Sequence, residues 1–168
     1  MKKACIILLL LAAVSASICL MAGGAAAQHS TLDKIGKDLH IGVSRGTVLT
    51  EEDSHGGFHG DGISFVSVQF EDDSFRDIVA GQDSWKPLPA DDPVQTLLYG
   101  SAGSGPYVTD GNGDRLFPLV QNGYYWLHDR QEGDRAEKSD ILHRPSLNFT
   151  VVVYDADART LYYSRMDT

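Results

Sequence analysis

Hydrophobic and polar positions alternate most clearly near the C-terminus. In residues 147–153, leucine, phenylalanine and valine take every second position, so they share one face of an extended strand. Residues 155–159 carry two aspartates and an arginine and predict a turn, after which residues 161–166 return as the partner strand. The pattern therefore predicts a β-hairpin at this end of the chain.

Three further segments have the pattern of strands. Residues 63–70 form a second clear strand, in which Val66, Val68 and Phe70 share one face and Ser67 and Gln69 the other. Residues 41–50 look extended, and residues 124–128 form a short aromatic strand. Together with the hairpin they predict about five strands.

Three segments have the spacing and the end signals of short helices. Leu32, Ile35 and Leu39 recur at helical intervals after a serine or threonine that can cap the first turn. Residues 72–81 begin with acidic side chains and end at a glycine. Residues 92–100 place a proline at the favoured first helical position and also end at a glycine.

Strands joined by hairpins, with the helices grouped together, imply the α+β class. We expect an antiparallel sheet of about five strands with two or three short helices on one face. The other face would carry aromatic and polar side chains. Residues 28–168 are long enough to form a single α+β domain with its own hydrophobic core.

The first 27 residues have the three parts of a secretory signal peptide. Two lysines at the start are followed by an apolar stretch over residues 4–22, and residues 25–27 are three alanines that fit a cleavage site. Cleavage is expected before Gln28, which predicts a secreted or extracytoplasmic protein. Two alternatives stay open: an uncleaved leader that anchors the chain, and lipid attachment at Cys19.

Loss of the leader changes both the thiol content and the charge. Both cysteines, Cys5 and Cys19, lie in the leader, so the mature chain has no disulfide and no thiol ligand. Removal of two lysines lowers the formal net charge from −9 to −11. Such a chain repels nucleic acid and, once the leader is cleaved, anionic membranes. Cations or a basic protein partner fit better, although acidity also serves solubility.

The glycine-rich segment 53–62 is the main candidate for chemistry. It reads Asp-Ser-His-Gly-Gly-Phe-His-Gly-Asp-Gly, with two imidazoles and two carboxylates in a short stretch. Imidazole and carboxylate oxygen suit zinc or another divalent ion, and a histidine beside an aspartate can also act as an acid or base. The candidate metal ligands are Asp53, His55, His59 and Asp61.

The alternative for this loop is structural or protein-binding. Glycine lets the backbone turn tightly, a buried Phe58 would pin the loop, and the polar side chains would satisfy its own backbone. The candidate binding residues are His55, Phe58, His59 and Asp61. No catalytic residue and no firm cofactor follow from the pattern, so a divalent metal is only one of the open alternatives.

Residues 110–114 (Asp-Gly-Asn-Gly-Asp) resemble the first half of a calcium loop, but Arg115 and Gln121 depart from its later positions. A plain surface turn explains the segment better.

Several segments together resemble a family of small exported proteins of Gram-positive bacteria. They are residues 53–62, 85–89, 122–125 and 148–168. The family has no assigned function, so the resemblance implies an extracytoplasmic location and supplies no activity or site.

The sequence thus favours a non-enzymatic, exported binding module. It would meet a protein or cell-envelope partner through an exposed sheet face or through the 53–62 loop. The alternative is a metal-dependent enzyme with its site at that loop. Enzymes usually draw their catalytic groups from several separated segments, and no spacing here points from another segment to the loop.

Overall fold

The computed structural model describes residue 24 and residues 26–56, 60–131 and 141–168. The chain divides into two compact units, Met1–Arg45 and Gly46–Thr168, and each is described by itself. In the first unit residues 26–39 are helical. Among the described residues, no helix combines the length and the apolar character that crossing a bilayer requires.

The helix of the first unit follows the predicted spacing. Its buried residues include Leu32, Ile35 and Leu39, which recur on one side of the helix. The helix ends where His40 takes a left-handed backbone conformation, with φ of 55°, and the backbone N–H of Ile41 donates to the carbonyl of Gly36 at 3.2 Å.

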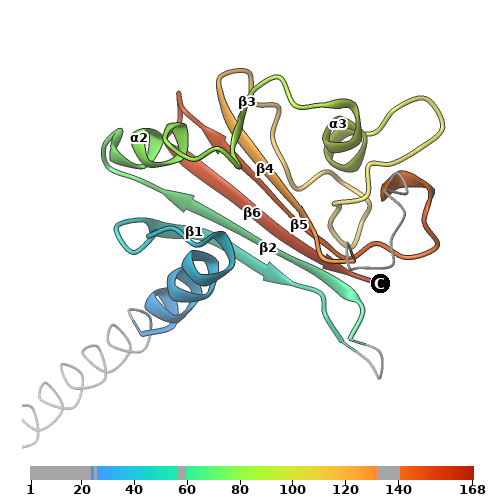
Figure 1. Cartoon of the computed structure of the whole chain (residues 1–168). Helices are drawn as coiled ribbons and strands as arrows, with labels where there is room; N and C mark the ends of the chain where they lie inside the picture. The colour runs from blue at the N-terminus through green and yellow to red at the C-terminus, as the bar shows by residue number, and fades with distance from the viewer. Residues whose placement is uncertain (1–23, 25, 57–59, 132–140) are drawn as a thin grey trace, which may run out of the picture. The chain divides into compact units, whose positions relative to one another are not determined.

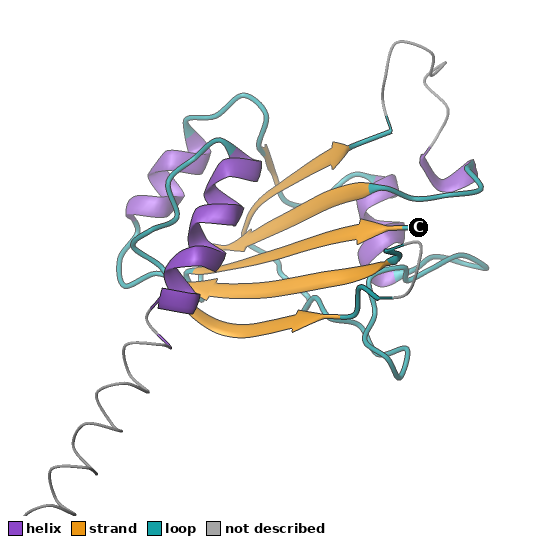
Figure 2. Ribbon diagram, turned by 90° about the horizontal axis from the view of Figure 1, so that it is seen from below, coloured by secondary structure: helices purple, strands orange, loops and turns teal. Residues whose placement is uncertain are grey.

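The second unit is built on an antiparallel sheet of six strands, with the strand order β1-β2-β6-β5-β4-β3 (Figure 1). The predicted C-terminal hairpin forms β5 and β6, which lie near the middle of the sheet. Figure 2 shows the long strands of the sheet lying side by side. The strands are β1 Thr47–Asp53, β2 Gly62–Gln69, β3 Lys86–Pro87, β4 Gly123–Asp129, β5 Phe149–Asp155 and β6 Thr160–Asp167.

Two α-helices and a short 3-10 helix complete this unit: α2 Ser74–Ala80, α3 Asp92–Tyr99 and η1 Ile141–His143. The side chain of Asp91 caps α3 by accepting a hydrogen bond from the backbone N–H of Val94 at 3.4 Å. Pro93 lies in the first turn and Gly100 ends the helix. The sequence signals for the second and third helices are therefore confirmed.

The predicted α+β class with an antiparallel sheet is also confirmed, and the sheet has six strands rather than about five. The added strand is β3, whose two residues pair with Tyr124 and Tyr125 of β4. The strand expected over residues 41–50 begins at Thr47 and continues through Asp53, so it includes the first residue of the candidate segment 53–62.

Alternation along β5 divides the core between the two faces of the sheet. On one face, Phe149, Val151 and Val153 form a buried cluster with Val94, Leu97 and Leu98 of α3. On the other face, the ring of Phe75 in α2 lies 5.3 Å from that of Tyr154 and stacks on Phe70 at 4.2 Å. The helices of this unit thus contact both faces, because neighbouring residues of β5 point in opposite directions.

Candidate functional site

The loop between β1 and β2 is closed at its base by Ser54 and Ile63. The backbone N–H of Ser54 donates to the carbonyl of Ile63 at 2.9 Å, and the Ser54 hydroxyl accepts from the N–H of Ile63 at 2.9 Å. Gly62 sits against His55 so closely that an added Cβ would lie 2.5 Å from the His55 Cα. Only glycine fits at position 62 without moving the histidine.

His55 lies between two carboxylates. Its Nδ1 is 2.6 Å from Oδ1 of Asp53, and the same oxygen accepts the backbone N–H of His55 at 2.9 Å. Its Nε2 is 3.3 Å from Oδ2 of Asp167, at the end of β6. The imidazole therefore ties the start of the β1–β2 loop to the C-terminal strand.

Asp167 is the centre of this network because two arginines also bind it. Arg130 Nη2 lies 2.7 Å from Oδ1, and Arg165 Nε lies 3.1 Å from Oδ2. Arg130 Nη2 also donates to the carbonyl of Met166 at 2.6 Å. Burial alone would raise the pKa of the Asp167 carboxyl, but the hydrogen bonds from Arg130 and Arg165 outweigh it and hold the pKa below its ordinary value.

This geometry bears on the metal hypothesis. A metal-bound histidine gives one ring nitrogen to the ion, whereas both ring nitrogens of His55 face carboxylate oxygens. Within the described part of the chain, no three His, Cys, Asp or Glu side chains gather in a group that could hold a metal ion. Asp53, His55 and Asp61 are described, whereas the expected residues Phe58 and His59 lie outside the described residues.

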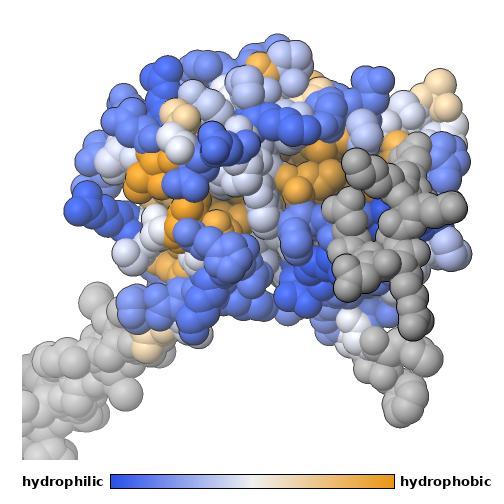
Figure 3. Space-filling view, in the orientation of Figure 1, coloured by the Kyte–Doolittle hydropathy of each residue, from blue (hydrophilic) through white to orange (hydrophobic). Residues whose placement is uncertain are grey.

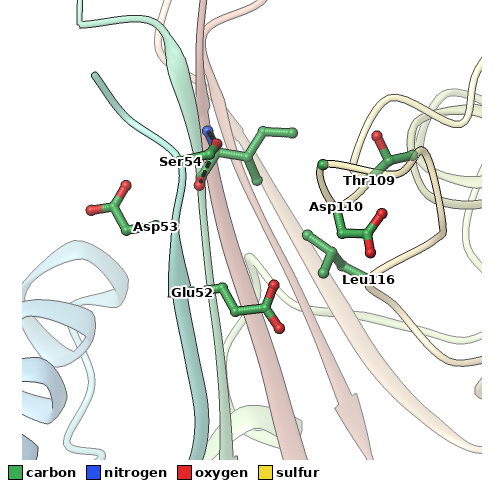
Figure 4. A pocket seen from close by; sticks show the side chains of 8 residues that line it. Glu52, Asp53, Ser54, Thr109, Asp110 and Leu116 are labelled. Carbon is green, nitrogen blue, oxygen red and sulfur yellow. Dashed lines mark hydrogen bonds between the residues drawn. The ribbon is translucent and has the colours of Figure 1, made fainter. Parts of the chain in front are cut away.

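A cleft opens beside this network, between the β1–β2 loop and the segment 109–116. It consists of two adjoining hollows of ≈ 100 Å³ and ≈ 300 Å³. Both hollows are lined by the same five residues: Ser54, Ile63, Thr109, Asp110 and Gly111. The smaller hollow adds Glu52, Asp53 and Leu116 (Figure 4), and the larger one adds Asp61, Gly62, Met166, Asp167 and Thr168.

The lining of the cleft combines carboxylates with apolar surface. Ile63, Leu116 and Met166 supply apolar surface, and all three also pack against the buried cluster beneath. Asp167 is neutralised by its arginines, whereas no ion pair within the described residues involves Glu52 or Asp61. No lysine, arginine or histidine is among the described residues that line either hollow. The cleft is therefore negative and partly apolar.

The turn at residues 110–114 fixes one wall of the cleft. Oδ1 of Asp110 accepts the backbone N–H groups of Asn112 and Asp114, each at 2.9 Å. These backbone hydrogen bonds, from Asp114 first and then from Asn112, lower the pKa of the Asp110 carboxyl. The Asp110 carboxylate thus binds backbone groups of its own turn, which agrees with the interpretation of this segment as a surface turn.

Sequence reasoning identified the loop but missed its partners. Asp167, Arg130 and Arg165 come from two distant segments, and no sequence pattern links Arg130 to the loop. The spacing of Arg165 and Asp167, two residues apart in a strand, places both on one face. This spacing alone does not show that Asp167 lies near the loop. The register of β2 against β6, which pairs Gly62 with Asp167, is needed for that.

Comparison with known proteins finds no match: no protein-family model, no curated protein and no solved structure is similar enough to this chain to be reported.

Two carboxyl groups that are paired with arginines, Asp167 and Asp129, make the stability of the fold depend on pH. The pKa of Asp167 is lowered, and so is that of Asp129, where burial opposes but Arg144 outweighs it through a two-point hydrogen bond. A carboxyl whose folded pKa is lowered stabilises the protein above its unfolded pKa of about 4, and loses this contribution as the pH falls through the folded value. Urea unfolding should show little change from these groups between about pH 5 and 7 and a fall in the free energy of unfolding below about pH 4.

The Asp129→Asn variant serves as the control for this pH dependence, because it removes one of the two carboxyls. Its free energy of unfolding should fall less steeply below about pH 4 than that of the wild type. A free energy of unfolding that rises on acidification would contradict the assignment.

Proposed function

We propose that this protein is an exported, non-enzymatic binding module that takes a cationic group of a protein or cell-envelope partner in the cleft beside the β1–β2 loop. The observation that carries the proposal is the pair of carboxylates Glu52 and Asp61 at an apolar lining, with no cation paired to either within the described residues. The long stem of a lysine or arginine can lie on such apolar surface while its charged end meets the carboxylates.

The charge of the whole chain supports the same partner. A formal net charge of −9 attracts basic groups over several ångströms and repels nucleic acid and anionic lipid. Hydrophilic residues cover most of the face seen in Figure 3, with hydrophobic residues showing between them. A partner recognised mainly by charge fits this surface better than one recognised through a broad apolar face.

The proposal includes export of the protein out of the cytoplasm. The leader over residues 1–27 supports export to a secreted or extracytoplasmic place, with retention by an uncleaved leader or by lipid at Cys19 as the alternatives. The resemblance of the 53–62 loop and other segments to small exported proteins of Gram-positive bacteria supports the same location.

A basic peptide provides the test of cleft binding. We expect a fluorescent peptide of alternating lysine and threonine to bind the wild type, and a Glu52→Gln/Asp61→Asn variant to bind about fivefold more weakly, because two unpaired carboxylates are lost. Fluorescence anisotropy measures both dissociation constants. Asp83→Asn is the matched control, because it removes one exposed carboxylate elsewhere and should bind like the wild type. Equal dissociation constants for the wild type and the double variant would contradict the proposal.

The alternative function is a metal-dependent enzyme using Asp53, His55, His59 and Asp61. Elemental analysis of the purified protein separates the two functions. For a binding module we expect far less than one metal ion per chain, and a His55→Ala/His59→Ala variant should have the same metal content as the wild type. Stoichiometric zinc or another divalent metal that is lost in the double variant would favour the enzyme and contradict the binding module.

A further inference from the structure

β1 lies at the outer edge of the sheet. It is the first strand in the sheet order and pairs with β2 on its inner side. Six of its seven residues are exposed. A strand at a sheet edge presents backbone N–H and C=O groups to which another extended segment can add as a new strand.

Charge distinguishes the C-terminal half of β1 from its first half. A β-bulge between Val48 and Thr50 shifts the register, and three consecutive acidic residues, Glu51 to Asp53, follow it. Because successive side chains alternate, Glu52 points to the cleft side of the sheet and Asp53 to the opposite side (Figure 4). An added strand would therefore meet negative charge on both of its faces.

This charge decides which strand can add. A second copy of β1 would bring three more carboxylates against the first three, and like charges opposite each other destabilise a strand pair. Basic side chains on the added strand would instead face opposite charges, and one of them would reach the hollow lined by Glu52 and Asp110. The edge thus selects a basic extended segment.

We propose that an extended basic segment of a partner protein adds to β1 along residues 50–53 as a further strand, with a lysine or arginine side chain entering the cleft beside Glu52. This inference rests on the proposed function, because the cleft must accept cationic groups. It goes further by defining the partner as a protein with an extended segment. Main-chain hydrogen bonds give the affinity, and the cleft gives the preference for lysine or arginine.

Backbone methylation of the peptide separates strand addition from attraction by charge alone. The probe is a synthetic seven-residue peptide of alternating lysine and threonine, and its counterpart carries N-methyl groups on alternate amides, which keep every charge but cannot donate to β1. Chemical shifts of the backbone amides of the purified protein are followed by NMR while each peptide is added. Glu52→Gln tests the cleft, and Asp83→Asn is again the control.

We expect the unmethylated peptide to shift the amides of residues 50–53 and the methylated peptide to bind at least about fivefold more weakly. The Glu52→Gln variant should bind the unmethylated peptide about threefold more weakly than the wild type does. Equal affinity of the two peptides, with shifts confined to residues 61 and 109–111, would overturn strand addition and leave the proposed function standing. Absence of binding by both peptides, or equal binding of a glutamate–threonine peptide, would overturn both.

Discussion

Replacing Phe149 with alanine should lower the free energy of unfolding by about 3–5 kcal/mol, the largest effect of any change considered. Phe149 is fully buried in the cluster shared by β5 and α3. The substitution removes most of its apolar contacts and leaves a cavity that rigid strands on both sides cannot close. Its register partner is Met166, which lines the cleft, so the packing of Phe149 also supports the cleft from beneath.

Urea unfolding followed by circular dichroism measures this effect, and Phe149→Leu is the matched control. Leucine keeps most of the apolar volume, so its cost should stay below about 1.5 kcal/mol. An alanine variant as stable as the leucine variant would show that the cluster does not close around this ring, contrary to the arrangement described.

Replacing Asp167 with asparagine should lower the free energy of unfolding by about 2 kcal/mol. The side chains of Arg130 and Asp167 are only 20% and 26% exposed, so the arginine would keep a charge with little access to water and without its carboxylate. The contact between Nε2 of His55 and Oδ2 of Asp167 would also weaken. The β1–β2 loop would then lose its tie to β6.

Hydrogen exchange distinguishes loss of the tie from general destabilisation. In Asp167→Asn the amides of Ser54 and His55 should exchange faster, while amides in the middle of β5 should change only by the global loss in stability. Asp83→Asn, an exposed substitution, should leave both rates near those of the wild type. Unchanged exchange at Ser54 and His55 in Asp167→Asn would contradict the role of Asp167 in holding the loop.

The fold was largely predictable because its signals are local. Period-two alternation predicts β2 and the β5–β6 hairpin, and the acidic, proline and glycine signals at the helix ends predict α2 and α3 within a residue or two. β3 is not predicted because its two residues, Lys86 and Pro87, carry no strand pattern of their own; they pair because β4 lies next to them. The sequence predicts a strand only up to residue 50, because Glu51, Glu52 and Asp53 are poor strand formers; pairing with β2 overrides that preference.

The site was predictable only in part. The histidine and aspartate content of the 53–62 loop pointed to Asp53, His55 and Asp61, and the structure pairs the first two. The remaining partners depend on tertiary register: Asp167 meets His55 because β2 and β6 are antiparallel, so the start of β2 at Gly62 lies beside the end of β6 at Asp167. The cleft itself depends on the approach of the turn at residues 110–114, which no sequence pattern links to the loop. Charge and local chemistry can be derived from sequence, whereas the assembly of distant segments cannot.

The position at which a cationic peptide binds distinguishes the cleft from the rest of the acidic surface. A lysine–threonine peptide with a nitroxide label beside its central lysine broadens the NMR signals of nearby amides. We expect the strongest broadening at Asp61, Thr109 and Gly111, around the cleft. Strongest broadening at α2, on the other face of the sheet, or uniform broadening over the whole acidic surface would contradict it.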